Sequence, residues 1–491
     1  IVSLIDRLAK FASRSPHAIP TSIKIFDIFY QQLEAIILER ESMSDQDKLA
    51  MLVSLQNLSL HCYPTELGYV DTVLALATKV VTADKGAKGV ITERAVSLEV
   101  QKLLKTPMNT YNNVLQLIKL EKYTALLQTL KYADRKRTAA EIGQNAIDNA
   151  TKIPNADSAV KLLAILKPLV QDEDDQPDEE IDPEMFQDEQ ALIARLIHRF
   201  DSDTIESLFA TYIEAKKIFD LGGNRKRYTF LPLAFGVLRL ATKIQTNRES
   251  DENWERKAKK VCKFAMELVG SLREGDIPVI TLRLYLQCAL TASQCGFEDF
   301  AYNFVAQAFE IYEEEIADSK LKYECIGSIV SVLNHVTTFD DDNYDTLVTQ
   351  ATQHSSRLLK KVDQSRAVCR CTHLFWNKKI KVGGRVMKCL QRSLKIANQT
   401  KAVDTAHLSL YIEILNHCLY YFHDHGAGEE AIEPTFINNL INHIQQTFDD
   451  MGPELSKNSI AYTHYGSTLT FIKLKQVDVE SWQAIKLPAS S

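Results

Sequence analysis

Apolar residues recur three or four positions apart along most of this chain. This spacing places them on one face of an α-helix, and a folded protein buries that face. The pattern is clearest within residues 26–37, 282–290, 323–333 and 386–397, where polar residues fill the intervening positions. It predicts a succession of amphipathic helices.

Short stop signals separate these segments, and each of them contains glycine or proline. They lie at residues 15–16, 62–64, 84–89, 106–107, 222–224, 295–296, 383–384 and 452–453. Two helix starts also carry cap residues: Asp182 precedes Pro183, and Asp203 with Glu206 fits a capping box. Helix is therefore expected to follow helix through turns of a few residues.

The spacing of the stops indicates roughly 20 to 22 helices, so that antiparallel helix pairs repeat every ~40 to 47 residues, the period of HEAT-like arrays. We predict an all-α fold, an α-solenoid of HEAT-like antiparallel helix pairs, over residues 1–475, followed by a carboxy-terminal tail at residues 476–491. The pairs share no consensus, which leaves two or three separate helical domains as the alternative. The lack of a Gly/Ser-rich linker favours the continuous array.

Composition supports this fold class and narrows the function. The 491 residues exceed one ordinary core, which stops growing near roughly 250 to 300 residues. Only 17 glycines and 13 prolines are present, too few for the many turns of sandwiches and barrels. The net charge of −7 and the dispersed cations argue against nucleic acid as the partner.

The same sequence features bear on the cellular compartment. Nine scattered cysteines are typical of reduced thiols in a cytosolic protein. No apolar stretch reaches the roughly 18 residues of a membrane span, and Asp6 and Arg7 interrupt the apolar start that a signal peptide needs. The chain begins at Ile1 rather than at methionine, so we expect it to be part of a longer protein.

One acidic segment, residues 172–189, departs from the helical pattern. Eleven of its eighteen residues are acidic and none is basic, which predicts an exposed, self-repelling loop. It lacks the ligand spacing of a calcium loop. A solvated connection is the plainer interpretation. The alternative is a weak docking surface, in which Asp174, Asp175, Glu179 and Glu180 meet basic residues of a second copy.

The densest basic cluster comprises Lys216, Lys217, Arg225, Lys226 and Arg227 around the glycine stop at residues 222–223. Its spacing fits neither a Walker loop nor GxGxxG. A helix stop followed by cations is one interpretation, and a binding surface for acidic motifs of a partner protein is the other.

Candidate metal and catalytic residues are few. Cys369, Cys371 and His373 lie close together, but a zinc site needs more ligands, and buried thiols between helices are the preferred interpretation. His423, Asp424 and His425 form a second weak cluster, which an exposed helix end explains equally well. No nucleophile with an adjacent base is apparent. We therefore predict no enzyme activity, no metal and no cofactor.

Six strings, taken together and in order, resemble one known family. The strings are FDIFYQQL (26–33), TYNNVLQLIKL (110–120), DPEMFQDEQALIARLIH (182–198), GGNRKRYTFLPLAF (222–235), CTHLFW (371–376) and LYIEILNHCLYYF (410–422). They are similar to the carboxy-terminal half of the vacuolar protein sorting-associated protein 35 family, the large scaffold subunit of retromer. The resemblance extends from about residue 4 to about residue 465.

This resemblance implies an α-solenoid scaffold on the cytoplasmic side of endosomal membranes, reached only through the coat, that retrieves transmembrane cargo from endosome to Golgi and plasma membrane. Implied partners are the metallophosphoesterase-fold small subunit and a second copy, which together build arches. Sorting nexins and the tail of the WASH complex are further implied partners. The arrestin-like subunit binds the family through a PRLYL motif, which this sequence lacks, so its binding is assigned to the other half.

Two alternatives from other classes remain at this stage. A hydrolase or transferase would need catalytic residues that the sequence does not show. A helical-repeat nucleic-acid-binding protein, or another adaptor, would keep reading side chains at fixed repeat positions. The degenerate pairs and negative net charge argue against such a code.

Overall fold

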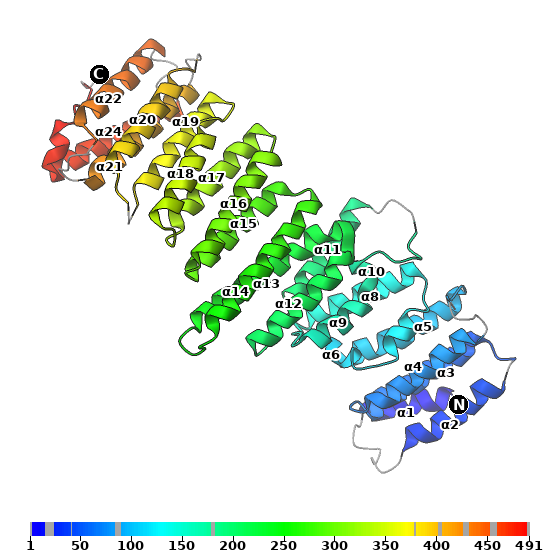
Figure 1. Cartoon of the computed structure of the whole chain (residues 1–491). Helices are drawn as coiled ribbons and strands as arrows, with labels where there is room; N and C mark the ends of the chain where they lie inside the picture. Colours follow the sequence, from blue (N-terminus) through cyan, green and yellow to red (C-terminus); the bar gives the residue numbers. More distant parts are fainter. Residues whose placement is uncertain are drawn as a thin grey trace. The chain divides into compact units, whose positions relative to one another are not determined.

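The computed structural model describes residues 2–14, 24–40, 42–83, 90–177, 182–377, 380–400, 405–425, 432–451 and 459–488. Within these ranges helix follows helix and no β-strand forms (Figure 1). Isolated β-bridges join Ile153 to Phe200 and Trp376 to Lys381. The predicted all-α class is confirmed.

The contacts divide the chain into two units. Unit 1 comprises residues 1–257 and 267–275, and unit 2 comprises residues 258–266 and 276–491. Helix α14 (Trp254–Gly270) contributes residues to both units. The predicted continuity of one array over residues 1–475 stays a prediction.

Unit 1 contains a row of helices in which each member packs on the next. The row consists of α1 (Val2–Arg14), α3 (Asp45–Cys62), α5 (Arg94–Tyr111), α8 (Tyr132–Asp148), α11 (Pro183–Ile197) and α13 (Lys226–Thr246). Other helices pack onto this row directly or through a neighbour: α2 (Ile25–Glu39), α4 (Leu67–Thr82), α6 (Val114–Leu117), α7 (Tyr123–Leu127), α9 (Ala156–Ile165), α10 (Lys167–Val170) and α12 (Ile205–Phe219), with the 3₁₀ turns η2 (Asp220–Arg225) and η3 (Ser271–Gly275).

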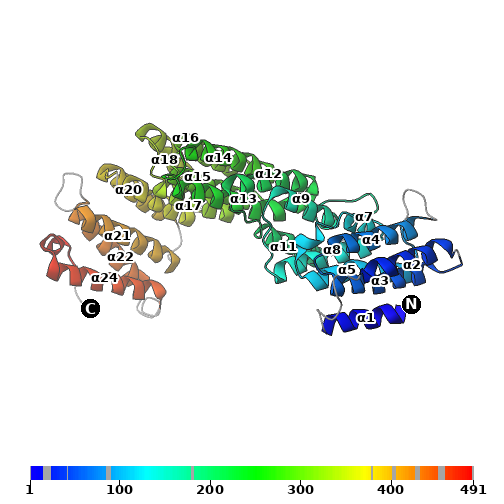
Figure 2. The same cartoon turned by 90° about the horizontal axis from the view of Figure 1, so that it is seen from below.

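Unit 2 contains a second row of this kind, whose helices can be followed from α15 to α24 in Figure 2. Its row consists of α15 (Pro278–Gln294), α17 (Ser319–His335), α19 (Lys361–Arg370), α21 (Thr405–His425) and α24 (Ile460–Asp478). The intervening elements are α16 (Glu298–Glu314), α18 (Asp341–Ser355), η4 (Cys371–Phe375), α20 (Gly383–Ala397), α22 (Pro434–Met451) and η5 (Glu480–Ala484). The first four row helices begin 41, 42 and 44 residues apart, which confirms the expected period in this unit.

Several local predictions are confirmed and two are wrong. Asp182 caps α11 by accepting from the backbone N–H of Glu184, and the stop at 222–224 contains Gly223 with φ of +54°, where glycine costs least. Thr204 rather than Asp203 caps α12, because the Thr204 side chain accepts from the N–H of Ser207. The expected stop at 106–107 does not end a helix. Pro107 lies inside α5, whose packing keeps the chain helical until Tyr111.

Candidate functional site

The predicted basic cluster lies at the end of α12, in η2 and at the start of α13, but its members do not form one free surface. Lys216 pairs with Asp220 and Lys217 with Glu214, each at 2.7 Å. Lys226 pairs with Glu274 at 3.0 Å. Most of the cluster is thus neutralised by acids of the same unit, and it differs in this respect from an open cationic patch.

Arg225 is the most buried member of the cluster. Only 5% of the residue is exposed, and its guanidinium pairs with Asp172 at 2.6 Å and lies 5.7 Å from the ring centre of Phe186. Arg227, two residues on, is exposed and lies 4.9 Å from the ring of Tyr228. Arg225 is therefore placed to hold the chain together, whereas Arg227 is accessible to a partner.

The first part of the acidic segment is held by the same unit. Glu173 accepts from Nε and an Nη atom of Arg135, at 3.0 and 2.7 Å, and Asp175 accepts from that Nη atom at 2.6 Å. The Arg135 side chain is 7% exposed. Two carboxylates on one buried guanidinium hold this stretch against α8. Because the guanidinium is shielded from water, these charge-assisted hydrogen bonds are stronger than they would be at the surface.

The four acidic residues predicted to contact a second copy have different surroundings. Asp174 is exposed, while Asp175 already pairs with Arg135. Glu179 and Glu180 lie outside the described residues. From Pro183 onward the segment belongs to α11, whose Glu189 pairs with Lys136 at 2.8 Å. The part of the segment before residue 178 is thus less solvated than charge repulsion alone predicts.

One face of the unit 2 row carries polar links between neighbouring helices. Arg366 of α19 donates three hydrogen bonds to the Glu413 carboxylate of α21, two from Nε and one from an Nη atom, at distances of 2.8 to 3.1 Å. Arg370 lies 5.2 Å from the ring centre of Tyr323 on α17. These contacts link side chains of three successive helices of the row, α17, α19 and α21.

The last helix of that row carries an apolar stripe. Phe471, Leu474 and Val477 lie three residues apart on α24 and are all exposed, Val477 to 84%. Behind them Trp482 of η5 is fully buried and contacts Phe471 and Phe422 edge-on. Adjacent exposed apolar side chains above a packed aromatic cluster are typical of a protein-binding surface.

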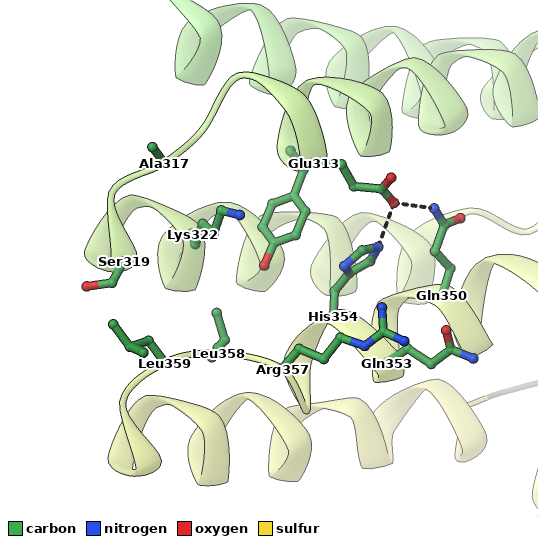
Figure 3. A pocket seen from close by; sticks show the side chains of 11 residues that line it. Glu313, Ala317, Ser319, Lys322, Gln350, Gln353, His354, Arg357, Leu358 and Leu359 are labelled. Atoms are coloured by element: carbon green, nitrogen blue, oxygen red, sulfur yellow. Dashed lines mark hydrogen bonds and ion pairs between the residues drawn. The ribbon is translucent and has the colours of Figure 1, made fainter.

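A cavity of about 600 Å³ opens between α16, α17 and α18 (Figure 3). Glu313 accepts from His354 at 2.8 Å and from Gln350 at 3.0 Å. Arg357 and Leu359 lie on the opposite side of the opening, and Leu359 is 82% exposed. The lining thus combines one acid, Glu313, with the cations Lys322 and Arg357 and the exposed apolar Leu359, a mixture that suits a protein contact.

The candidate metal cysteines are buried thiols. Burial raises the pKa of Cys369 to about 12 and that of Cys371 to about 11, so both remain protonated and weakly nucleophilic. His373 hydrogen-bonds through Nδ1 to the Tyr421 hydroxyl at 2.9 Å. Among the described residues, no three His, Cys, Asp or Glu side chains gather as metal ligands.

The second weak cluster lies at the end of α21. Asp424 accepts from the Trp376 indole at 2.7 Å and from Lys381 at 2.9 Å, while the side chain of His425 lies outside the described part. These bonds tie α21 to the segment after η4.

Across the described helices, none is long and apolar enough to cross a membrane.

Sequence reasoning missed the ion pairs that hold the acidic segment and the apolar stripe on α24. These ion pairs join residues 38 and 53 positions apart in the chain, so no local sequence pattern predicts them. A signal for the second was present, since apolar residues at 471, 474 and 477 also follow helical spacing. That spacing does not distinguish a buried face from an exposed one.

Fold and surfaces together define a helical-repeat protein with several faces suited to other proteins. The comparisons identify its family: the model of Vacuolar protein sorting-associated protein 35 matches residues 1–447. The chain is 35% identical over 459 residues to vacuolar protein sorting-associated protein 35 of Dictyostelium discoideum, covering 91% of this chain and 58% of that protein. The chain belongs to this family.

Two further relatives agree. Vacuolar protein sorting-associated protein 35A of Arabidopsis thaliana is 31% identical, with 99% of this chain and 62% of that protein covered. The Schizosaccharomyces pombe protein is 26% identical, with 87% and 50% covered. The chain therefore spans between half and two thirds of the length of these relatives.

Proposed function

We propose that this chain is the carboxy-terminal part of a non-catalytic scaffold subunit of the retromer coat, which retrieves transmembrane cargo from endosomes to the Golgi and plasma membrane. The family match over residues 1–447 carries the proposal. Packed helix rows support it, because they offer long faces that can bury a compact partner. A stable contact of this kind buries roughly 1,600 Å² in total.

The metallophosphoesterase-fold small subunit binds the row of unit 2 in this proposal. Two observations favour that face: the side chains linked across α17, α19 and α21, and the exposed stripe of Phe471, Leu474 and Val477 on α24. The links reduce the side-chain entropy lost on binding, and the stripe supplies apolar area.

Titration of the purified small subunit into the full chain by calorimetry tests this contact. Leu474→Asp with Val477→Asp is expected to weaken binding at least about tenfold, since two charges would be buried without partners. Ile28→Asp with Leu38→Asp is the matched control, because both residues are similarly exposed on α2 of unit 1. Equal affinities for the two variants would refute the proposed face.

Two copies of the chain also associate in this proposal, and two surfaces are candidates. The first is the acidic segment, where the exposed Asp174 meets cations of another copy. Asp175, Glu179 and Glu180 are the other residues that the sequence predicts for this contact. The second is the cavity of Figure 3, because its opposite sides carry both charge signs around the exposed Leu359. A surface of that composition can pair with itself about a twofold axis.

Acidic motifs of accessory proteins, including sorting nexins and the WASH complex tail, are the proposed ligands of the basic cluster. Lys217 and Arg227 are its exposed members and are the preferred contact residues. Fluorescence anisotropy with an acidic peptide should show weaker binding to Lys217→Glu with Arg227→Glu. Unchanged affinity at physiological salt would show that the basic cluster does not bind acidic motifs.

A further inference from the structure

The cavity of Figure 3 contains one residue to which the functions above give no role. His354 of α18 is the only histidine among the described residues that line it. Histidine is the side chain whose charge changes between pH 5 and pH 8, whereas carboxylates, ammonium groups and guanidinium groups ordinarily keep theirs across this range. A change of pH near neutrality therefore alters the charge of this cavity through His354.

The contacts of His354 hold its imidazole beside Glu313. Nε2 lies 2.8 Å from Oε1 of Glu313, which also accepts from Gln350 at 3.0 Å. The rings of Phe309 and Tyr312 pack against the imidazole, with ring centres 5.8 and 5.1 Å away, and only 15% of the side chain is exposed. Imidazolium and one neutral tautomer both carry a proton on Nε2. Protonation can therefore add a charge next to Glu313 without moving the ring.

The other ionisable groups around His354 come from three helices. Helix α16 contributes Glu313 and the hydroxyl of Tyr312, α17 contributes Lys322, and α18 itself contributes Arg357. The remaining elements packed on α18, which are η4 and α19, add no ionisable side chain to the described lining. With neutral His354, two cations of the lining accompany one carboxylate, and protonation raises the number of cations to three.

We propose that His354 is a pH-sensitive switch of self-association through this cavity: two copies associate while His354 is neutral and separate once it is protonated. The inference rests on the cavity being the self-association surface proposed above. In that twofold contact, Glu313 of one copy would face Arg357 of the other. A protonated His354 neutralises Glu313 and repels the approaching Arg357, so the attraction between the copies is weakened at both ends of the contact.

The direction of the pH effect follows from proton linkage. Association brings the cation Arg357 of the second copy toward His354, and a nearby like charge opposes protonation. Two monomers therefore bind more protons than the dimer they form, and a falling pH favours monomers. Because the contact occurs twice about the axis, up to two protons are taken up per dimer, and the Kd rises at most about a hundredfold per pH unit.

Sedimentation velocity of the full chain at low salt, at pH 8 and at pH 6, tests the switch. The Kd of the unchanged chain should rise at least about fivefold between these pH values, and that of His354→Gln less than about twofold, because glutamine can donate to Glu313 but carries no charge. His354→Lys, which is charged at both pH values, should weaken the dimer at pH 8. His335→Gln is the matched control at an exposed position of α17 and should respond to pH as the unchanged chain does.

Glu313→Lys with Glu314→Lys at pH 8 shows separately whether the cavity is the self-association surface. If this variant loses the dimer while the unchanged chain and His354→Gln respond equally to pH, the surface stands and the switch is overturned. If the variant dimerises as the unchanged chain does, both the surface and the switch are overturned. Effects of acid on folding or on other histidines are shared by the unchanged chain and His354→Gln, so the difference between their pH responses reports on His354.

Discussion

At the scale of single residues, close packing in unit 1 leaves no room at one glycine. A Cβ atom on Gly222 would lie 2.8 Å from the backbone carbonyl oxygen of Val170. Backbone cannot rotate away as a side chain can, so Gly222→Ala should lower the free energy of unfolding by about 1–3 kcal/mol. Urea denaturation followed by circular dichroism measures the change.

Gly466→Ala is the control for that prediction. Gly466 lies inside α24, and a Cβ there would meet nothing within 4 Å. Alanine should therefore stabilise the helix by roughly 0.5–1 kcal/mol. Similar unfolding midpoints for both variants would contradict the packing described around η2.

A second residue-scale prediction concerns His417. Burial, with repulsion from His373 and Arg370, lowers the pKa of His417 from 6.5 to about 4. The unfolded chain therefore binds more protons than the folded chain between these pH values. The contribution of neutral His417 to stability is complete above about pH 6.5 and is lost as the pH falls toward 4.

The His417→Gln variant removes this titration. Its free energy of unfolding should change less between pH 6.5 and pH 4 than that of the unchanged chain, with urea denaturation as the measurement. His335→Gln, at an exposed position ending α17, should leave the pH dependence intact. Parallel curves for all three proteins would show that folding does not lower the pKa of His417.

At the scale of elements, two arginines of the basic cluster should differ in their effects. Arg225→Glu would bury a carboxylate beside Asp172, its present ion-pair partner at 2.6 Å, and should destabilise unit 1 by about 3–5 kcal/mol. Arg227→Glu changes the same charge at an exposed position and should cost less than about 1 kcal/mol. Thermal unfolding of the two variants side by side measures the difference. If both melted alike, Arg225 could not be the anchor of the acidic segment.

The sequence predicted the positions of the helices better than it predicted the ion-pair partners of their charged side chains. Binary pattern and stop residues were sufficient for the all-α class and for the 41- to 44-residue period of unit 2, because helix spacing is a local property. The partners of Arg135 and Arg225 lie 38 and 53 residues away. A dense run of carboxylates therefore predicts a solvated loop, because the sequence does not show that buried arginines lie beside it in the fold.

The same limit applies to the helix ends and surfaces. Pro107 is a stop signal locally, yet α5 continues past it because the flanking Leu104 and Met108 are buried. The exposure of Leu474 and Val477 likewise depends on the absence of a covering helix among the described residues, not on their spacing. Where tertiary packing determines burial, periodicity alone cannot separate core from interface.

At the scale of the whole molecule, the cavity of Figure 3 provides a direct test of self-association. In the proposed twofold contact, Glu313 of the cavity and its exposed neighbour Glu314 in one copy would face Arg357 of the cavity and the exposed Lys360 in the other, and the reverse pair would form at the same time. Glu313→Lys with Glu314→Lys should therefore weaken the dimer at least about tenfold, and Arg357→Glu with Lys360→Glu should do the same. Light scattering at low salt measures both effects.

Mixing the two charge-reversed proteins distinguishes this arrangement from contact through the acidic segment. Each mixed pair would place four cations opposite four acids, so dimers should reform and should dissociate as salt screens the contact. Asp174→Asn, which leaves the cavity unchanged, should not affect dimers formed in this way. The acidic segment would instead be the self-association surface if the mixture stayed monomeric and if Asp174→Asn, as the single substitution, dissociated the dimer. The charges that pair two copies would then lie in unit 1 rather than beside Leu359.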